Sequence, residues 1–190
     1  MGSDDYHHGD LRNALVRTAV DLITEKGRQG FSLAEVSRRT GVSAAAPFRH
    51  FDGKDDLLAA VARLSYEEQE RRFAAAVART EEPIDQLAAF ASEAVRFAVE
   101  EPALFDVAFG GFDKEDRPEL EAAGARVLDV LRPAAEQLRP AEPFGLVLAV
   151  AAVAHGFAMF FRDGVVGSAD DAERGASAAA TAIAAAEAQG

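Results

Sequence analysis

The chain has 190 residues, with 32 acidic side chains against 20 basic ones, and it contains no cysteine and no tryptophan. The missing cysteines exclude disulfides and thiolate metal sites. With 49% hydrophobic and 27% charged residues, the composition fits a globular chain with a sizeable core, and it excludes a disordered or fibrous one. The first ten residues lack the basic start and apolar run of a secretory signal, so we expect a cytoplasmic protein.

The negative charge is concentrated in the C-terminal part of the chain. Residues 1–60 carry eight basic and nine acidic side chains, whereas residues 61–190 carry twelve and twenty-three. Within the first part, residues 28–50 hold four arginines against one glutamate. A polyanion responds to a local patch of charge more than to the chain average, so the acidic total does not exclude nucleic acid as a partner. We expect the two parts to have different roles.

Apolar residues recur at helical spacing almost throughout the chain, and no alternating strand pattern is bounded by hairpin turns. The sequence therefore predicts an all-α fold. The first helix follows the apolar stripe from Leu11 to Ile23 and is expected to end at Lys26, because Gly27 can take the left-handed conformation that closes a helix.

Two short helices are predicted next, joined by a glycine turn. Ser32 and Glu35 have the spacing of a capping box, which starts a helix from residue 33 to about residue 40. Gly41 suits the turn, and Ser43 is a good cap for a second short helix that runs through Phe51. Helix, glycine turn and helix together form the pattern of a helix-turn-helix, which enters the major groove of DNA.

The rest of the chain predicts six longer elements. Four of them begin at a proline, which is well tolerated in the first helical turn because its missing N–H would have no partner there. The expected spans are Lys54 to about Arg79, Pro83–Glu100, Pro102–Phe109, Pro118–Leu138, Pro143–Arg162 and Asp170–Ala188, which brings the total to about nine helices.

Residues 144–161 contain no formal charge, and this length reaches the lower bound for a membrane span. The run is rich in alanine and glycine, has His155 in its middle and lacks a basic flank, so we favour a helix buried on most sides. Its small residues, together with the alanine-rich last helix, would allow close helix packing. We therefore expect Pro143–Arg162 and Asp170–Ala188 to form a dimer seam.

The stretch from Tyr6 to about Ala62 resembles the DNA-binding domain of the TetR family of bacterial transcriptional regulators. The most specific part is GVSAAAPFRHFDGKDDLL, with its Gly-Val-Ser turn, its aromatic-x-His-Phe end and its Lys-Asp-Asp-Leu helix start. YHHGDLR, AAPFRHF and VAHGFAMFF further resemble a subgroup with a His-Gly pair in a penultimate helix.

The resemblance implies a homodimer whose two recognition helices read a palindromic operator, usually as a repressor that a small molecule releases. It implies an N-terminal tail and three-helix helix-turn-helix domain in residues 1–53, and a C-terminal helical bundle for ligand binding and dimerisation in residues 54–190. The alternative is a helical small-molecule-binding or adaptor protein without sequence-specific DNA binding. No enzyme motif is present, and we expect neither catalysis nor a cofactor, metal or membrane partner.

The predicted DNA-binding residues are Ser32, Leu33, Ser43, Ala44, Ala45, Phe48, Arg49, His50 and Lys54. Ser32 and Ser43 start helices, where hydroxyl and backbone N–H groups favour phosphate, although capping alone would also explain them. The resemblance places His50 and Lys54 at positions that grip phosphate.

Base reading is expected to depend on few side chains. Phe48 stands where the family usually has a tyrosine, whose hydroxyl can reach a phosphate. The alanines offer only methyl groups, so Arg49 is the main candidate for a hydrogen bond to guanine. Pro47 should cost one backbone bond. Arg38 and Arg39 are either specific contacts or general surface charge.

For the C-terminal part we expect a small apolar or amphipathic ligand between the helices. The predicted ligand-binding residues are Phe73, Phe90, Ser92, Arg96, Phe97, Phe105, Phe109, His155 and Phe160. The sequence leaves open whether His155 is a core or interface histidine or contacts the ligand, and whether DNA binding represses or activates transcription.

Overall fold

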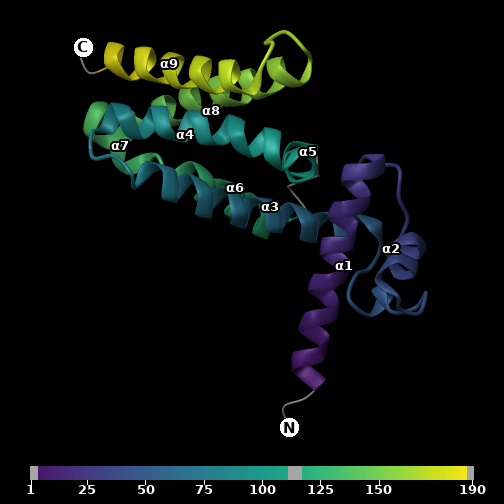
Figure 1. Ribbon diagram of the computed structural model, residues 1–190. Coiled ribbons are helices and arrows are strands. Elements are labelled where there is room, and N and C mark those ends of the chain that lie inside the picture. The colour runs from purple at the N-terminus through teal and green to yellow at the C-terminus, as the bar shows by residue number, and fades with distance from the viewer. Residues whose placement is uncertain (1–3, 111–116, 188–190) are drawn as a thin grey trace. The chain divides into compact units, whose positions relative to one another are not determined.

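The computed structural model describes residues 4–110 and 117–187, and all of the regular structure in these residues is helical (Figure 1). The prediction of an all-α fold is thereby confirmed. The elements are α1 (Asp4–Lys26), α2 (Leu33–Thr40), the 3₁₀ helix η1 (Pro47–Arg49), α3 (Lys54–Val77), α4 (Pro83–Glu100), α5 (Pro102–Phe109), α6 (Pro118–Asp129), α7 (Arg132–Leu138), α8 (Pro143–Arg162) and α9 (Ala169–Glu187).

The chain forms two compact units. Unit 1 comprises residues 1–65 and 102–120, and unit 2 comprises residues 66–101 and 121–190. The first part of α3 belongs to unit 1, where Leu57 and Val61 are fully buried and the Ser65 hydroxyl donates a hydrogen bond of 2.9 Å to the Leu104 carbonyl of α5. The functional boundary that the sequence places after residue 53 stays a prediction.

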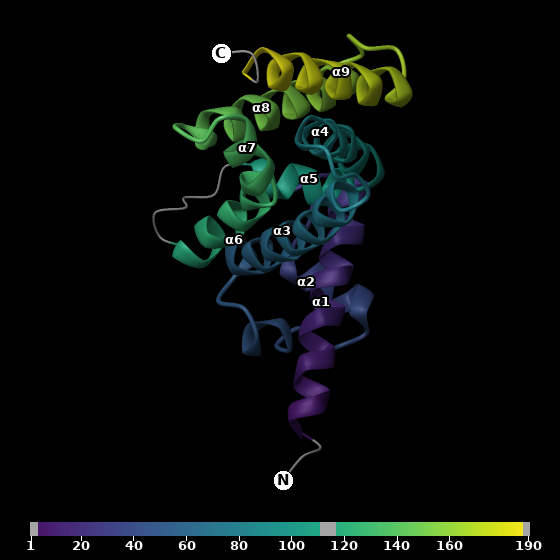
Figure 2. The ribbon, with the colours of Figure 1, turned by 90° about the vertical axis from the view of Figure 1, so that its left-hand side faces the viewer.

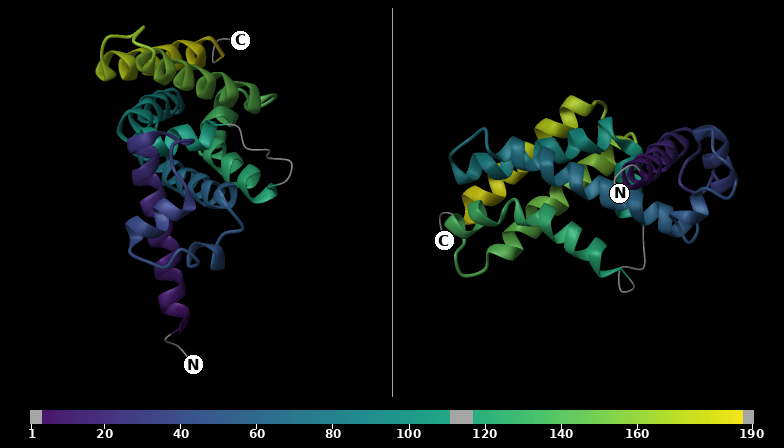
Figure 3. Two further views of the ribbon diagram at one scale, coloured as in Figure 1. Left: turned by 90° about the vertical axis from the view of Figure 1, so that its right-hand side faces the viewer. Right: turned by 90° about the horizontal axis from the view of Figure 1, so that it is seen from below.

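Unit 1 is built on α1. Leu15, Ala19 and Leu22 are buried, as their helical spacing predicts, and α2 lies beside this helix (Figure 3). The helix ends as predicted, because Gly27 has φ 73° and its N–H donates to the Ile23 carbonyl at 2.8 Å. At its start the expectation was wrong: α1 begins at Asp4, so most of the predicted N-terminal tail is helical.

In unit 2, α9 packs closely on α4 and α8 (Figures 1 and 2). One row of alanines, four residues apart, is completely buried, and it consists of Ala172, Ala176, Ala180 and Ala184. At Gly175 a Cβ atom would lie only 2.3 Å from the Phe157 ring, so a larger residue there would require this ring of α8 to move. The small residues of α9 therefore serve packing within the chain.

The predicted helix from Pro118 to Leu138 is two helices. α6 ends at Asp129 and α7 begins at Arg132, and Figure 2 shows them as separate helices. Pro133 lies near the start of α7, where it has no N–H for the Asp129 carbonyl and its ring would collide with that group in a continuous helix. Proline therefore divides this segment.

α8 is buried on one side only, whereas the sequence favoured burial on most sides. Its buried residues are Leu146, Val147, Val150, Ala154 and Ala158. Phe144, Leu148 and Phe160 are about half exposed. Among the described residues, α8 is also the one helix with the length and hydropathy of a membrane span, with a mean hydropathy of 2.1. Its packing against α4, α7 and α9 is that of a core helix with one uncovered face.

Candidate nucleic-acid interface

The start of α2 is fixed by Ser32, which takes an extended conformation and accepts a hydrogen bond of 3.3 Å from the Glu35 N–H on its hydroxyl. This is one half of the predicted capping box. The Glu35 carboxylate pairs instead with Lys26 of α1 and lies 3.7 Å from Arg38. Ser32 is exposed, so its hydroxyl can still meet a phosphate, whereas the side chain of Leu33 is 8% exposed and leaves only its backbone for a DNA contact.

The turn after α2 is set by Gly41, which has φ 78°. Its N–H donates to the Arg38 carbonyl at 3.3 Å, and the next N–H, of Val42, donates to the Ser37 carbonyl at 3.0 Å. This pair of bonds is a Schellman motif. The predicted glycine turn between the two parts of the motif is therefore confirmed.

The predicted second helix, Ser43 through Phe51, is wrong in its form. We call residues 43–49 the recognition turn: residues 44 and 45 form a turn, residue 46 a bend, and only Pro47–Arg49 are helical, in 3₁₀ geometry. Pro47 cannot donate to the Ser43 carbonyl, which instead accepts from the Ala46 N–H at 3.0 Å, and the Arg49 N–H likewise donates three residues back to Ala46 at 3.2 Å. The helix-dipole argument for phosphate at Ser43 loses its basis.

The recognition turn has one buried side and one exposed side. Ala46 and Pro47 are buried, and Phe51, just beyond the turn, is 2% exposed. The exposed members are all predicted DNA-binding residues, namely Ser43, Ala44, Ala45, Phe48 and Arg49. The structure thus brings these five side chains together on one short segment, with Phe48 61% exposed.

Lys54, in the first turn of α3, is anchored to the segment that precedes α2. Its ammonium group lies 4.5 Å from the centre of the Phe31 ring and donates a hydrogen bond of 3.2 Å to the Gln29 carbonyl. The hydrogen bond uses one of the three N–H donors of the ammonium group, and the two contacts together fix the orientation of the Lys54 side chain. His50 is half-buried and lies beside Phe51, with ring centres 6.4 Å apart.

Arg38 and Arg39, which the sequence treats alike, differ in their contacts. Arg39 makes a bidentate ion pair with Glu25 of α1 at 2.5 and 2.6 Å, and these hydrogen bonds lower the pKa of Glu25. The Arg38 side chain is 76% exposed. Arg39 therefore links α2 to α1, and Arg38 is the one available to a polyanion.

The predicted ligand-binding residues do not gather in one place. Phe73, Phe90 and Phe97 form an edge-to-face cluster in unit 2, with ring centres 4.9 and 6.0 Å apart, and none is more than 3% exposed. They are core residues in this structure. Phe105 is buried and Phe109 is 54% exposed, and both lie on α5 in unit 1.

Ser92 and Arg96, predicted to orient a ligand, contact α9 instead. Arg96 pairs with Glu173 at 2.6 Å, and the Ser92 hydroxyl lies 3.4 Å from the same carboxylate. The hydrogen bond to Glu173 raises the pKa of Arg96. Both residues thus tie α4 to α9.

Glu93, a buried carboxylate that is not among the predicted site residues, continues this network. Glu93 is 8% exposed and accepts from Arg96 at 3.1 Å and from Arg72 of α3 at 2.6 Å. Arg72 also pairs with Glu100 at 2.7 Å. The signal was present in the sequence: Glu93 stands three residues after Phe90, on the apolar stripe of α4, where an acidic side chain needs a partner.

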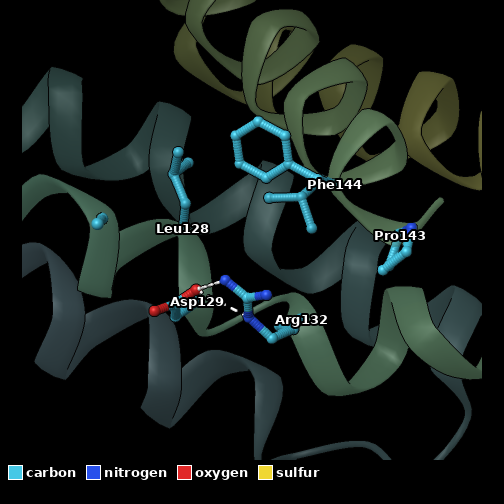
Figure 4. A pocket seen from close by; sticks show the side chains of 7 residues that line it. Leu128, Asp129, Arg132, Pro143 and Phe144 are labelled. Carbon is cyan, nitrogen blue, oxygen red and sulfur yellow. Dashed lines mark hydrogen bonds and ion pairs between the residues drawn. The ribbon is translucent and has the colours of Figure 1, made fainter.

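The described part of unit 2 has hollows on its surface. One, of about 160 Å³, is formed by α6, α7 and α8, with Phe144 and Leu128 on one side and the Asp129–Arg132 ion pair on the other (Figure 4). Another, of about 520 Å³, is lined by residues of α4 and α9, among them Ser92, Glu173 and Ser177. The predicted aromatic residues line neither of them, and the ligand site stays a prediction.

His155 is half-buried on α8, next to the glycine that forms the predicted His-Gly pair. Burial, with a smaller contribution from the charge of Arg162, lowers the pKa of the imidazole below its ordinary value of 6.5. The unfolded chain therefore binds this proton more readily than the folded one, so the stability that His155 contributes above about pH 6.5 is lost as the pH falls.

We expect the free energy of unfolding to fall between about pH 7.5 and about pH 5.5, and His155→Gln to make this fall shallower. Urea titrations of both proteins at several pH values, at one protein concentration, measure the two slopes. An identical pH dependence in the variant would contradict the assignment.

The sequence and the fold resemble those of known proteins. Residues 15–61 match the family model described as "Bacterial regulatory proteins, tetR family", and residues 87–183 match "Tetracyclin repressor-like, C-terminal domain". The HTH-type transcriptional regulator BetI of Brucella anthropi is 33% identical over 78 residues, which are 41% of this chain and 40% of that protein. The chain thus spans less than half the length of the curated relatives that it matches.

Among solved structures, a protein with unknown function from Rhodococcus sp. RHA1 is similar over 97% of this chain and 98% of that one, with a TM-score of 0.82 and 25% identity. The TetR family transcriptional regulator PfmR from Thermus thermophilus covers 89% of this chain and 96% of its own, with a TM-score of 0.68 and 24% identity, and supports the fold. The two family matches together cover both the helix-turn-helix and the C-terminal helices. The chain belongs to the TetR family of bacterial regulatory proteins.

Proposed function

We propose that this protein is a ligand-responsive, DNA-binding transcriptional regulator without enzymatic activity, which acts in the cytoplasm. In this proposal it is a repressor that binds a palindromic operator as a homodimer and is released by a small molecule. The observation that carries the proposal is the recognition turn, where five predicted DNA-binding side chains are exposed while Ala46 and Pro47 are buried.

The charges around the recognition turn support DNA as the partner. Arg49 is exposed and makes no ion pair within the described residues, Arg38 is largely exposed, and Lys54 is fixed at the start of α3 by its bond to the Gln29 carbonyl. Arginine in the major groove can bond guanine in a bidentate manner, and exposed basic side chains release counterions when they meet phosphates.

A homodimer is favoured by the face of α8 that the chain leaves uncovered. Phe144, Leu148 and Phe160 are each 44–54% exposed there, and exposed apolar patches of this kind are typical of interfaces. A two-fold symmetric contact buries the same patch on both copies and places two recognition turns for two half-sites.

Arg49 and Lys54 test the proposal because they have different expected roles. Arg49→Ala should relax the preference at one base position in each half-site, at a cost of about 1–3 kcal/mol for each bidentate pair removed. Lys54→Ala should weaken binding to all sequences about equally and reduce the slope of log affinity against log salt by about one for each phosphate that is no longer neutralised. Fluorescence anisotropy with labelled duplexes at several salt concentrations measures both effects.

The matched control is Arg174→Ala, because this arginine is exposed in unit 2 and its loss changes the net charge by the same amount. It should leave affinity and salt slope close to those of the wild type. If Arg49→Ala had no effect on base preference while Arg174→Ala changed DNA affinity, the recognition turn would not be the interface. A protein that binds no DNA sequence in preference to another would support the alternative, a helical ligand-binding or adaptor protein.

A further inference from the structure

We infer that the recognition turn reads the 5-methyl groups of thymines, so that each half-site of the operator is defined by methyl contacts and at most a few hydrogen bonds. The inference rests on the proposed function, because it names the chemical feature of DNA that the same surface recognises. Three observations carry it: the chemistry of the exposed side chains, their arrangement, and the way the backbone holds them.

The exposed side of the recognition turn has few polar groups. Of its five exposed side chains, only Ser43 and Arg49 can make hydrogen bonds, whereas Ala44, Ala45 and Phe48 present carbon and hydrogen alone. A base pair in the major groove offers nitrogen and oxygen atoms and one apolar group, the thymine methyl. Three of the five side chains therefore have a single complementary group on a base edge.

Phe48 is the largest apolar group on this surface. Its side chain is 61% exposed, and it lacks the hydroxyl with which a tyrosine could reach a phosphate or a base acceptor. Ala44 and Ala45, on the same short turn, are also exposed and carry only methyl side chains. These three side chains make the exposed side of the turn largely apolar, and the Phe48 ring is removed from water only when an apolar group of a partner covers it.

The backbone keeps the exposed side chains of the recognition turn in fixed positions. The Pro47 carbonyl accepts hydrogen bonds of 2.9 Å from the N–H groups of both His50 and Phe51. Pro47 and Ala46 are buried beneath the turn, and the proline ring fixes its own φ. A rigid turn cannot move to fill the space that a missing methyl group leaves, so its affinity for DNA depends on whether the methyl group is present.

Methyl reading has a specific consequence for modified bases. Uracil differs from thymine only by the missing methyl, and 5-methylcytosine carries the same methyl while exchanging the oxygen acceptor at position 4 for an amino group. Where Phe48 supplies the contact, uracil should bind more weakly than thymine. At the same position 5-methylcytosine, paired with guanine, should bind more tightly than cytosine.

The test begins with duplexes that the wild-type protein enriches from random DNA. Each thymine of the enriched half-site is replaced in turn by uracil, and affinity is measured by anisotropy for the wild type and for Phe48→Ala. One methyl group removed from an apolar contact corresponds to about fourfold in affinity per half-site, from about 0.8 kcal/mol per buried carbon group, and to roughly fifteenfold when both half-sites are changed. Phe48 is exposed, so its replacement should leave the fold intact, which circular dichroism checks.

We expect uracil to lower the affinity of the wild type at one or two of the thymine positions. At one of these positions the loss of affinity should be absent in Phe48→Ala. At that position the wild type should also bind 5-methylcytosine more tightly than cytosine. An enriched operator on which uracil has no effect at any thymine would overturn the inference and leave the proposed function standing. A penalty that persists in Phe48→Ala and in the double variant Ala44→Gly/Ala45→Gly would place the methyl contact elsewhere and also overturn it. If no sequence is enriched, the proposed function itself fails.

Discussion

Glu93→Gln is expected to lower the free energy of unfolding by about 2–3 kcal/mol at pH 7, a large loss of stability for a single substitution that conserves side-chain shape. The carboxylate is 8% exposed and holds Arg72 and Arg96 together. Removing one partner of a buried ion pair typically costs about 3–5 kcal/mol, because the remaining charge loses its compensation. The expected loss is smaller here because Arg72 keeps Glu100 and Arg96 keeps Glu173.

The ion pairs around Glu93 explain why the loss of stability in Glu93→Gln should involve more than one contact. For Arg72, burial acts to lower the pKa, but the hydrogen bonds to Glu93 and Glu100 raise it overall. Its guanidinium also lies 5.6 Å from the centre of the Phe97 ring, in the aromatic cluster. Glu93→Gln therefore weakens the attachment of α3 and α9 to α4 at the same time.

Urea unfolding at a fixed protein concentration measures this effect, with an unchanged m-value as the sign that only stability has changed. Glu68→Gln is the matched control, because Glu68 pairs with Arg71 within α3 at the surface of the same unit. An exposed pair of this spacing contributes only about 0.3 kcal/mol. Equal losses in the two variants would contradict a role for Glu93 in joining the three helices.

If the protein is the proposed dimer, Ala152→Glu is expected to yield monomers and to reduce operator affinity by roughly a hundredfold or more, because two half-sites are then no longer bound as one unit. Ala152 is exposed on α8, between Leu148 and Gly156, where an added Cβ would also meet open space. In a symmetric interface each substitution buries two new charges, at roughly several kcal/mol per ion. Ala158, on the buried side of α8, is 1% exposed within the chain, so a charge there would test folding instead.

Analytical ultracentrifugation at micromolar concentration and anisotropy with an operator duplex measure the two consequences. Ala75→Glu is the control, since it adds the same charge at an exposed position of α3 in the same unit. It should sediment as the wild type does. A wild type that is monomeric, or an Ala152→Glu protein that remains dimeric, would show that α8 is not the seam.

Helix boundaries could be predicted where local chemistry decides them. Pro83–Glu100, Pro102–Phe109 and Pro143–Arg162 are confirmed to the residue, because proline in the first turn and the apolar spacing mark one boundary and one face in the sequence itself. Proline failed as a guide at positions 47 and 133, where its effect depends on which carbonyl would lie four residues earlier in the helix.

The site residues could be predicted where neighbouring residues in the sequence decide their position. The exposed side of the recognition turn follows from a motif of adjacent residues, so the sequence contains all of its members. The ligand-binding prediction treated aromatic residues as candidates wherever helices were apolar, but whether a ring lines a cavity or fills a core depends on contacts between distant segments. Phe73, Phe90 and Phe97 pack on one another across α3 and α4, and this leaves no space between them for a ligand.

Ion pairs between distant helices were also beyond local pattern reading. Arg96 and Glu173 are 77 residues apart, and their contact depends on the alanine row that lets α9 approach α4. Arg39 and Glu25 are closer in sequence, but only the left-handed geometry at Gly27 and the packing of α2 beside α1 bring them within 2.5 Å.

The central claim is that the recognition turn gives this protein sequence-specific binding to DNA. The most direct measurement is enrichment of bound duplexes from random DNA, followed by titration of the enriched sequence and of its scrambled counterpart at about 0.15 M salt. We predict an inverted repeat that is bound about a thousandfold or more tightly than the scrambled duplex, with this preference reduced in Arg49→Ala. Equal affinity of the wild type for the two duplexes would contradict the claim.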